Sequence, residues 1–285
     1  MVVDGLVLTL LTLVFVVAQI VSHRWIKKVT NCYLFWVIIG AFWFIWLCVF
    51  RFGPDWTRHA DATITNPGGY EDSIIISKAF LLDVCPFAGL AMCFSLMVDP
   101  SRKAARALSP IALIGGLITV ASLAFDETNN ARLTAQFIFI GDPENDGMKC
   151  YFILHFLQVV LSVGVMLNTP RNGWKGALAT FGTIMGYYCY VAIVMAATGC
   201  RWNVSGLNLN DWSPDGEYHF VSEIFNIPVK ACPYIGIPFL VLVGCGIVAL
   251  KDYVFDRGWF AYGNAYSKRW YLWYDYNRYV VQKWI

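Results

Sequence analysis

Long apolar runs separated by short polar segments dominate the pattern of this sequence. A helix needs about 20 mainly apolar residues to cross the hydrocarbon core of a bilayer. Seven stretches meet that requirement, and they cover residues 5–22, 33–50, 74–98, 108–125, 150–167, 176–198 and 231–250. The segments between them are rich in Pro, Gly, Asn and Asp, which is typical of loops. Because the runs are long and lack the two-residue alternation of strands, they predict an all-α membrane protein, a bundle of about seven transmembrane helices.

The composition excludes several other classes of protein. Of the 285 residues, 58% are hydrophobic and only 14% are charged, whereas about a quarter of a soluble domain is charged. The net charge of +2 comes without a basic block, so we expect no nucleic-acid partner. No small-residue cleavage site follows the first run, and residues 5–22 are therefore interpreted as a retained helix. Residues 1–250 form the expected transmembrane domain, and residues 251–285 form a separate tail.

The distribution of Lys and Arg predicts the orientation of the spans. If the loop after the first span is cytoplasmic, 14 of the 21 basic residues lie on that side of the membrane and 7 on the other. Basic residues concentrate in cytoplasmic loops. We therefore expect an N-terminus outside and a C-terminus inside.

Ionisable residues within the spans are few, and they are functional candidates because each costs free energy in lipid. In the third span Asp83 lies two residues before Cys85, and Pro86 follows at once. Proline usually kinks a helix, which would free a carbonyl near the cysteine. The alternatives are a protonated or paired Asp83 that packs helices, and a Cys85 that acts as a small hydrophobic residue. Lys78 is the other charged residue of this span.

His155 lies in the fifth span at a depth similar to that of Cys85. Counted from Lys149 and Lys78, the two residues lie six and seven positions into their spans, which is about 9–10 Å at the rise of an α-helix. A thiol, an imidazole and the nearby carboxylate of Asp83 are the groups of an activated cysteine nucleophile. The other interpretation of His155 is a hydrogen-bonded packing residue.

Metal or cofactor binding receives little support from the sequence. The four histidines are scattered, and neither a Cys-x-x-Cys nor a His-x-x-x-His pair occurs, so we expect no metal and no cofactor. Asp55, His59 and Asp61 are the nearest to a ligand group, but they fall in the expected first outer loop, where a solvated loop is the simpler interpretation.

The loop over residues 199–230 and the tail over residues 251–285 are unusual in composition. Trp202 and Trp212 in the loop favour a packed or interfacial segment over a free one, and Cys200 could either pair with Cys232 or stay free. Aromatic residues of the tail recur at helical spacing with basic residues between them: Trp270, Trp273, Tyr274, Val281 and Trp284. This pattern predicts an amphipathic helix at the membrane interface, acting as an anchor or as a docking surface for partner subunits.

Several short motifs occur in an order that resembles a known family. These are LLDVC at 81–85, the Gly115-Gly116 pair, YFILH at 151–155, ATGCRWNVSGLN at 197–208 and PYIGIP at 233–238. Together, over about residues 75–250, they resemble the YwaF-like family of integral membrane proteins. Eukaryotic relatives in that family are proposed to be acyltransferases of ether phospholipids that use a cysteine and a histidine. The resemblance implies that Cys85 is the nucleophile, that His155 is the histidine and that Asp83 is the acidic residue of the motif.

Two functions remain open at this stage. One is acyl transfer between membrane phospholipids through Cys85, His155 and Asp83, with the thiol as nucleophile, the imidazole as proton carrier and the carboxylate as its orienting group. The other is a non-catalytic accessory subunit of a larger membrane complex. A transporter or channel is disfavoured, because charged residues within the spans are too few to line a water path.

Overall fold

The structure, a computed structural model, describes residues 3–125, 131–142, 149–169 and 174–254, and in these ranges the regular secondary structure is helical. The first half contains α1 (Val3–Thr30), α2 (Tyr33–Leu47), the π-helical turn η1 (Cys48–Phe52), α3 (Gly53–His59), α4 (Tyr70–Phe80), α5 (Val84–Val98) and α6 (Lys103–Ser122). The second half contains α7 (Ala135–Phe139), α8 (Tyr151–Asn168), α9 (Trp174–Thr198), η4 (Leu209–Trp212), α10 (His219–Ile224), η5 (Val229–Ala231) and α11 (Cys232–Val254).

The predicted all-α fold is confirmed. Within the described ranges, 7 helical stretches are long and apolar enough to cross a membrane, and they run over Val3–His23, Tyr33–His59, Tyr70–Val98, Lys103–Ser122, Tyr151–Asn168, Trp174–Thr198 and Val229–Lys251. Each of them overlaps one of the stretches predicted from the hydrophobic pattern. The chain is thus a multi-pass helical protein of the membrane type. The amphipathic helix predicted within residues 255–285 lies outside the described residues.

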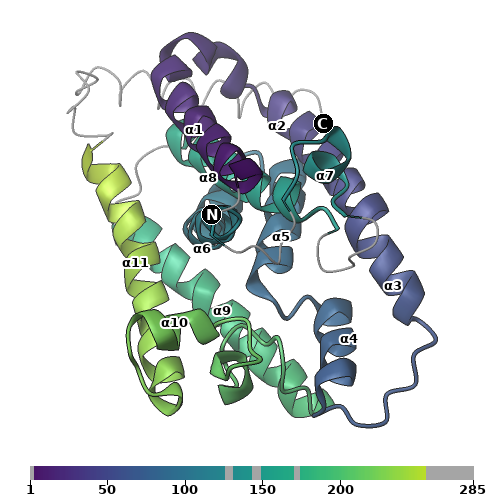
Figure 1. The fold of residues 1–285 in the computed structure, drawn as a ribbon. Coiled ribbons are helices and arrows are strands. Elements are labelled where there is room, and N and C mark those ends of the chain that lie inside the picture. Colours follow the sequence, from purple (N-terminus) through teal and green to yellow (C-terminus); the bar gives the residue numbers. More distant parts are fainter. Residues whose placement is uncertain (1–2, 126–130, 143–148, 170–173, 255–285) are drawn as a thin grey trace.

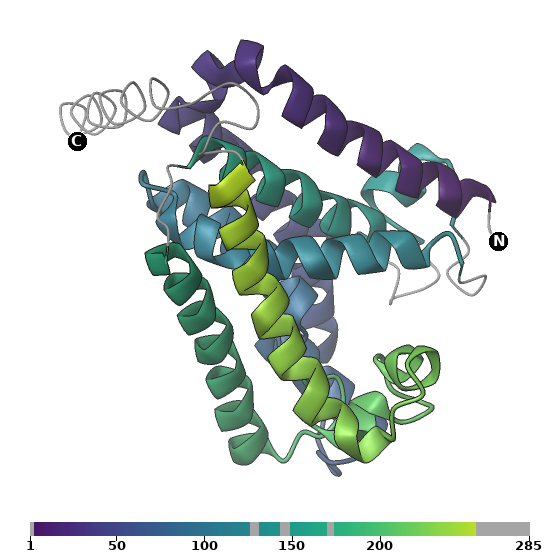
Figure 2. The ribbon, with the colours of Figure 1, turned by 90° about the vertical axis from the view of Figure 1, so that its left-hand side faces the viewer.

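Helices α6 and α8 form the centre of the array. They pack against each other more extensively than any other pair, and α6 also contacts α1, α5, α9 and α11. Figure 1 shows α6 end-on near the middle, and in Figure 2 α1, α6 and α8 run across the view while α9 and α11 run steeply down it. Of the spans, α8 is the most enclosed, with 72% of its apolar window buried. Residues on α8 therefore face protein on most sides.

The second span is longer than predicted. Helices α2 and α3 join through the π-helical turn into one continuous helical stretch that ends at His59, nine residues beyond the expected end at residue 50. Asp55, expected in a solvated outer loop, is consequently buried with 3% of its surface exposed. Single π turns within α-helices are frequent at functional sites.

The third span is broken rather than kinked at its proline. Helix α4 ends at Phe80, Leu81 adopts a left-handed conformation with φ 52°, and the Leu82 amide donates to the Ser77 carbonyl at 2.9 Å. Helix α5 then begins at Val84 and carries Pro86 in its first turn. Backbone N–H groups of a first turn have no partner within the helix, so a proline there removes none. The expectation that Pro86 kinks a continuous helix is therefore wrong: the interruption lies at 81–83.

Candidate functional site at the break in the third span

The break leaves one backbone carbonyl without a partner in the helix, and two side chains that are distant in sequence form hydrogen bonds with it. The Leu82 carbonyl accepts a hydrogen bond from the Tyr187 hydroxyl at 2.7 Å and another from the Ser205 hydroxyl at 2.8 Å. Non-helical backbone at membrane depth is tolerated only where protein or a water-filled cavity surrounds it. In transporters, such discontinuous helices build the binding site. The break is therefore a supported feature of the fold, held by α9 and by the segment that follows it.

Asp83 starts α5. Its Oδ1 accepts a hydrogen bond from the Cys85 amide at 3.1 Å, so the carboxylate is the N-cap of the helix. Aspartate is among the preferred N-cap residues because its side chain satisfies an amide that has no helical partner. The carboxylate thus fixes the backbone that carries the Cys85 thiol.

The thiol of Cys85 points toward α6. A Cβ placed at Gly115 would lie 3.1 Å from its Sγ, and Thr119 lies one turn further along α6. From α8, Gln158 donates from Nε2 to the Cys85 carbonyl. The Gln158 side chain is 1% exposed, and its Oε1 has no hydrogen-bond partner within the described part of the chain. Cys85 thus lies against α6 and α8, and it is half-buried.

His155 is buried and makes its contacts within α8. Its Nδ1 lies 2.7 Å from the Tyr151 carbonyl, and its ring lies against the Tyr151 ring with centroids 4.8 Å apart. Because a carbonyl only accepts, we assign the proton to Nδ1, which leaves the lone pair on Nε2. Within the described part of the chain, the His155 imidazole forms no hydrogen bond with Cys85 or with Asp83.

The glycine pair of α6 allows α5 and α8 to approach α6 closely. A Cβ at Gly116 would lie 2.7 Å from the His155 carbonyl oxygen, while Gly115 faces the Cys85 thiol. Only a residue without a side chain allows both approaches. The residue of α8 at the level of Cys85 is Gln158, one helical turn beyond His155. The structure therefore brings Asp83 and Cys85 together directly, whereas His155 meets the glycine pair through its backbone carbonyl and its imidazole contacts Tyr151. The proton-transfer roles stay a prediction.

A second carboxylate near the thiol was missed in the sequence. Glu217, after α9, is a charged neighbour of both Cys85 and Asp83. Burial raises its pKa well above the ordinary value, and the carboxylates of Asp83 and Asp211 raise it further. Its side chain nevertheless keeps exposed surface. Glu217 thus adds a second carboxylate to the region of Cys85 and Asp83.

Arg51 is a positively charged residue near several ionisable groups of the site. It is a charged neighbour of Asp83, His155 and Glu217, and its Nη1 lies 3.1 Å from the Oδ2 of Asp55 in a buried ion pair. Asp55 Oδ1 has no hydrogen-bond partner within the described ranges. The sequence signal for this pair was its spacing of four residues, which places both side chains on one helix face.

The segment between α9 and α11, residues 199–231, is packed, which is one of the two forms that its tryptophans predict. Asp211 accepts hydrogen bonds from the amides of Asn203, Val204 and Gly206 at 2.7, 2.9 and 2.8 Å. Positive φ angles at Asn203, Ser205 and Gly206 turn these amides inward, which forms an anion-binding concavity. Asp211 fills it, and Ser205 is thereby held against the break.

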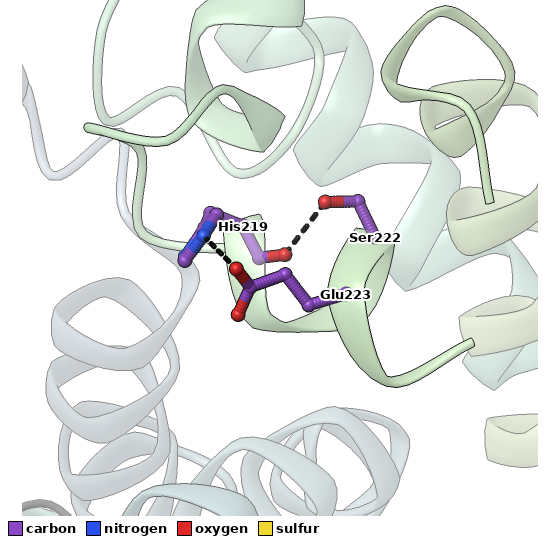
Figure 3. Close-up of polar contacts among 3 residues, drawn as sticks. All are labelled: His219, Ser222 and Glu223. Atoms are coloured by element: carbon purple, nitrogen blue, oxygen red, sulfur yellow. Dashed lines mark hydrogen bonds and ion pairs between the residues drawn. The ribbon is translucent and has the colours of Figure 1, made fainter. Parts of the chain in front are cut away.

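Three residues of α10 have the types found in hydrolase triads, but their geometry is different. His219 Nε2 lies 2.9 Å from Glu223 Oε1, whereas the Ser222 hydroxyl donates at 2.7 Å to the backbone carbonyl of His219. Figure 3 shows the hydroxyl directed at that carbonyl and away from the imidazole. Ser222 is therefore not activated by His219, and these contacts stabilise the short helix.

Cys200 and Cys232 form no disulfide with each other. Cys200 and Cys232 are free thiols that donate to the carbonyls of Ser73 at 3.4 Å and Pro228 at 3.5 Å. In the described part of the chain, no group of three His, Cys, Asp or Glu residues is placed to hold a metal ion. The set considered from the sequence, Asp55, His59 and Asp61, thus forms no such group.

Comparison with known proteins identifies relatives without an assigned activity. A family described as "Family of unknown function (DUF5378)" matches residues 7–268. The uncharacterized protein MG135 of Mycoplasma genitalium is 31% identical over 169 residues, or 55% of each chain. Its homolog in Mycoplasma pneumoniae is 30% identical over 165 residues, or 56% of this chain and 55% of that one. The chain thus spans about half the length of the curated relatives it matches. No solved structure matches.

Proposed function

Since this chain belongs to the DUF5378 family, whose function is unknown, we propose a function from the site itself: acyl transfer between membrane phospholipids, with Cys85 as the nucleophile. The observation that carries the proposal is the break in the third span. It places a half-buried thiol on the first turn of α5, next to an acidic N-cap, at a depth where irregular backbone is costly. The resemblance to the YwaF-like family, which is itself part of this proposal, also implies Cys85 as the nucleophile.

The reaction has two steps. The Cys85 sulfur bonds to the carbonyl carbon of a phospholipid ester, the bond from that carbon to the ester oxygen breaks, and the acyl chain remains as a thioester. The thiol proton passes to Nε2 of His155 and then to the departing lysophospholipid oxygen. The hydroxyl of a second lysophospholipid attacks the thioester, and its proton returns through His155 to the Cys85 sulfur. Acyl chain and proton balance, and no cofactor is required.

Other residues of the site have positioning roles in this proposal. Asp83 fixes the first turn of α5 through the Cys85 amide, and Gln158 fixes the same residue through its carbonyl. The neutral imidazole of His155 has an unshared electron pair on Nε2 for the thiol proton. The orientation predicted from the basic residues would place the site toward the outer leaflet.

Reconstituted liposomes provide the test. A phospholipid with a labelled acyl chain and an unlabelled lysophospholipid acceptor are incorporated with the purified protein, and label on the acceptor is measured. We expect Cys85→Ala to abolish transfer and His155→Ala to reduce it by at least about 100-fold, the usual effect of losing a general base. Cys93→Ala, at a buried cysteine of the same helix, is the matched control and should retain transfer. Unchanged transfer in Cys85→Ala would refute the mechanism.

The alternative function is an accessory subunit that binds partner subunits through its tail. Its support, the aromatic pattern within residues 255–285, lies outside the described residues, so it stays a prediction. Three results together would favour this function over the enzyme. The wild-type protein would show no acyl transfer, it would purify in a fixed ratio with another chain, and truncation at residue 254 would release that chain.

A further inference from the structure

A groove opens where the segment after α9 meets the first turn of α11. Its volume is about 480 Å³, and it is lined by Leu207, Leu209, Lys230, Pro233, Tyr234 and Ile237. That volume lies in the range of sites for small ligands. The groove is separate from the thiol: no residue that contacts Cys85 lines it.

The lining has one charge and an apolar wall. Lys230 is the only charged residue among the lining residues, its side chain is exposed, and no ion pair or hydrogen bond engages it within the described part of the chain. Tyr234 is 81% exposed. On the inner side, Leu207 and Ile237 pack against the hydrophobic core. The groove therefore offers a cation at one end and an apolar wall beside it.

The position of the groove along its span matches a membrane interface. The last span begins at Val229, so Lys230 and Tyr234 lie in its first turns, where basic and tyrosine side chains meet lipid headgroups. Further along α11, Ile235, Phe239 and Leu242 are exposed and recur at helical spacing. At about 100° per residue these three lie on the side of α11 away from Tyr234 and Ile237, so one side of the helix lines the groove and the other carries an apolar stripe of the kind that contacts lipid chains.

We propose that this groove binds one anionic glycerophospholipid, with its phosphate at the Lys230 ammonium and an acyl chain along Tyr234 and Ile237. Charge complementarity selects an anionic headgroup, and the apolar wall suits an acyl chain. A peptide fits less well, because its backbone N–H and C=O groups would find few polar partners in this lining. The proposal does not depend on chemistry at Cys85.

Photo-crosslinking in nanodiscs tests the site. The full chain is reconstituted in nanodiscs of phosphatidylcholine that contain a trace of phosphatidylglycerol with a diazirine on its acyl chain, and crosslinked peptides are quantified after irradiation. We expect label on residues 229–237 and 205–210. Lys230→Gln should lower it about fivefold, the effect of one basic residue near an anionic surface, and Lys230→Arg should restore it. Ile237→Trp, which fills the groove, should also lower it.

Two comparisons keep the result interpretable. Lys103→Gln, at an exposed lysine that begins another span, should leave the label unchanged. A diazirine on phosphatidylcholine should label these peptides less than the anionic probe does. Equal labelling by the two probes, or label unaffected by Lys230→Gln in protein with an unchanged melting temperature, would overturn the proposal. Because the readout is binding, it stands or fails independently of acyl transfer.

Discussion

The side-chain amide of Gln158 donates a hydrogen bond across the helix array to the carbonyl oxygen of Cys85. This contact joins α8 to the first turn of α5, immediately after the break in the third span. Asp83 holds the amide of the same cysteine, so Cys85 is fixed at both of its backbone polar groups. A nucleophile gains from such fixed geometry, because positioning lowers the entropic part of the barrier.

The close contact of α6 with α8 predicts a large effect at Gly116. A Cβ there would lie 2.7 Å from the His155 carbonyl oxygen, and backbone on both sides cannot yield without moving a helix. We expect Gly116→Ala to destabilise the protein by about 1–3 kcal/mol, the usual cost of overpacking, measured by thermal unfolding in detergent. Gly182→Ala on α9 meets nothing within 4 Å and should be neutral or stabilising. Equal effects of the two substitutions would contradict the packing.

The two donors to the Leu82 carbonyl should act as a unit. We expect Tyr187→Phe and Ser205→Ala each to cost about 1 kcal/mol, since either remaining donor still satisfies the carbonyl. The double variant leaves a buried carbonyl unpaired and should cost more than the sum. Thr183→Ala, whose exposed hydroxyl donates within its own helix at 2.9 Å, is the control. Strict additivity in thermal unfolding would mean that the carbonyl has another partner.

The sequence predicted the spans well and the break poorly, for one physical reason. A run of about 20 apolar residues is a local signal, and each predicted stretch overlaps an observed span. The break is not local: Leu81 and Leu82 are ordinary helix residues, and Pro86 drew attention to the wrong position. What stabilises the break are Tyr187 and Ser205, more than 100 residues away along the chain.

The charged residues that the sequence did not reveal as part of the site also depend on non-local packing. Ending the second span at residue 50 placed Arg51 and Asp55 in a loop, although their spacing fits a buried pair on a helix. Glu217 lies in a polar segment whose approach to Cys85 depends on the packing of Asp211 and Ser205. Cys85 and Asp83 could be singled out from the sequence because a carboxylate within an apolar span is rare.

The buried ion pair on the second span gives a prediction about stability. We expect Arg51→Met to destabilise the protein by about 3–5 kcal/mol, because it removes the ion-pair partner of the buried Asp55 carboxylate. The double variant Arg51→Met/Asp55→Leu should recover part of that loss. Arg58→Met, at an exposed position of the same helix, serves as the comparison in denaturation experiments. A double variant less stable than Arg51→Met would argue against the pair.

The carboxyl group of Glu217 predicts a pH dependence of the segment after α9. Burial, together with Asp83 and Asp211, raises its pKa. A carboxyl whose folded-state pKa is raised stabilises the fold fully below its unfolded pKa of about 4.3, and this contribution is lost as the pH rises through the folded-state value. We therefore expect faster hydrogen exchange at residues 203–206, corrected for intrinsic rates, as the pH rises through that window.

Two variants separate Glu217 from its neighbours. Glu217→Gln should flatten most of the pH dependence and slow exchange at neutral pH. Asp211, whose pKa is also raised by burial, would account for what remains. Asp215→Asn, at another exposed carboxylate of the same segment that is not a charged neighbour of Cys85, should behave as wild type. A pH profile that Glu217→Gln leaves intact would place the titrating group elsewhere.

The central claim is that Cys85 carries an acyl chain as a thioester. Peptide mass spectrometry of the protein after incubation with donor phospholipid, without acceptor, measures this directly. The mechanism predicts an acyl mass on the peptide that contains Cys85, removed by neutral hydroxylamine and absent from Cys85→Ala. A peptide that stays unmodified while label still reaches an added lysophospholipid would contradict it.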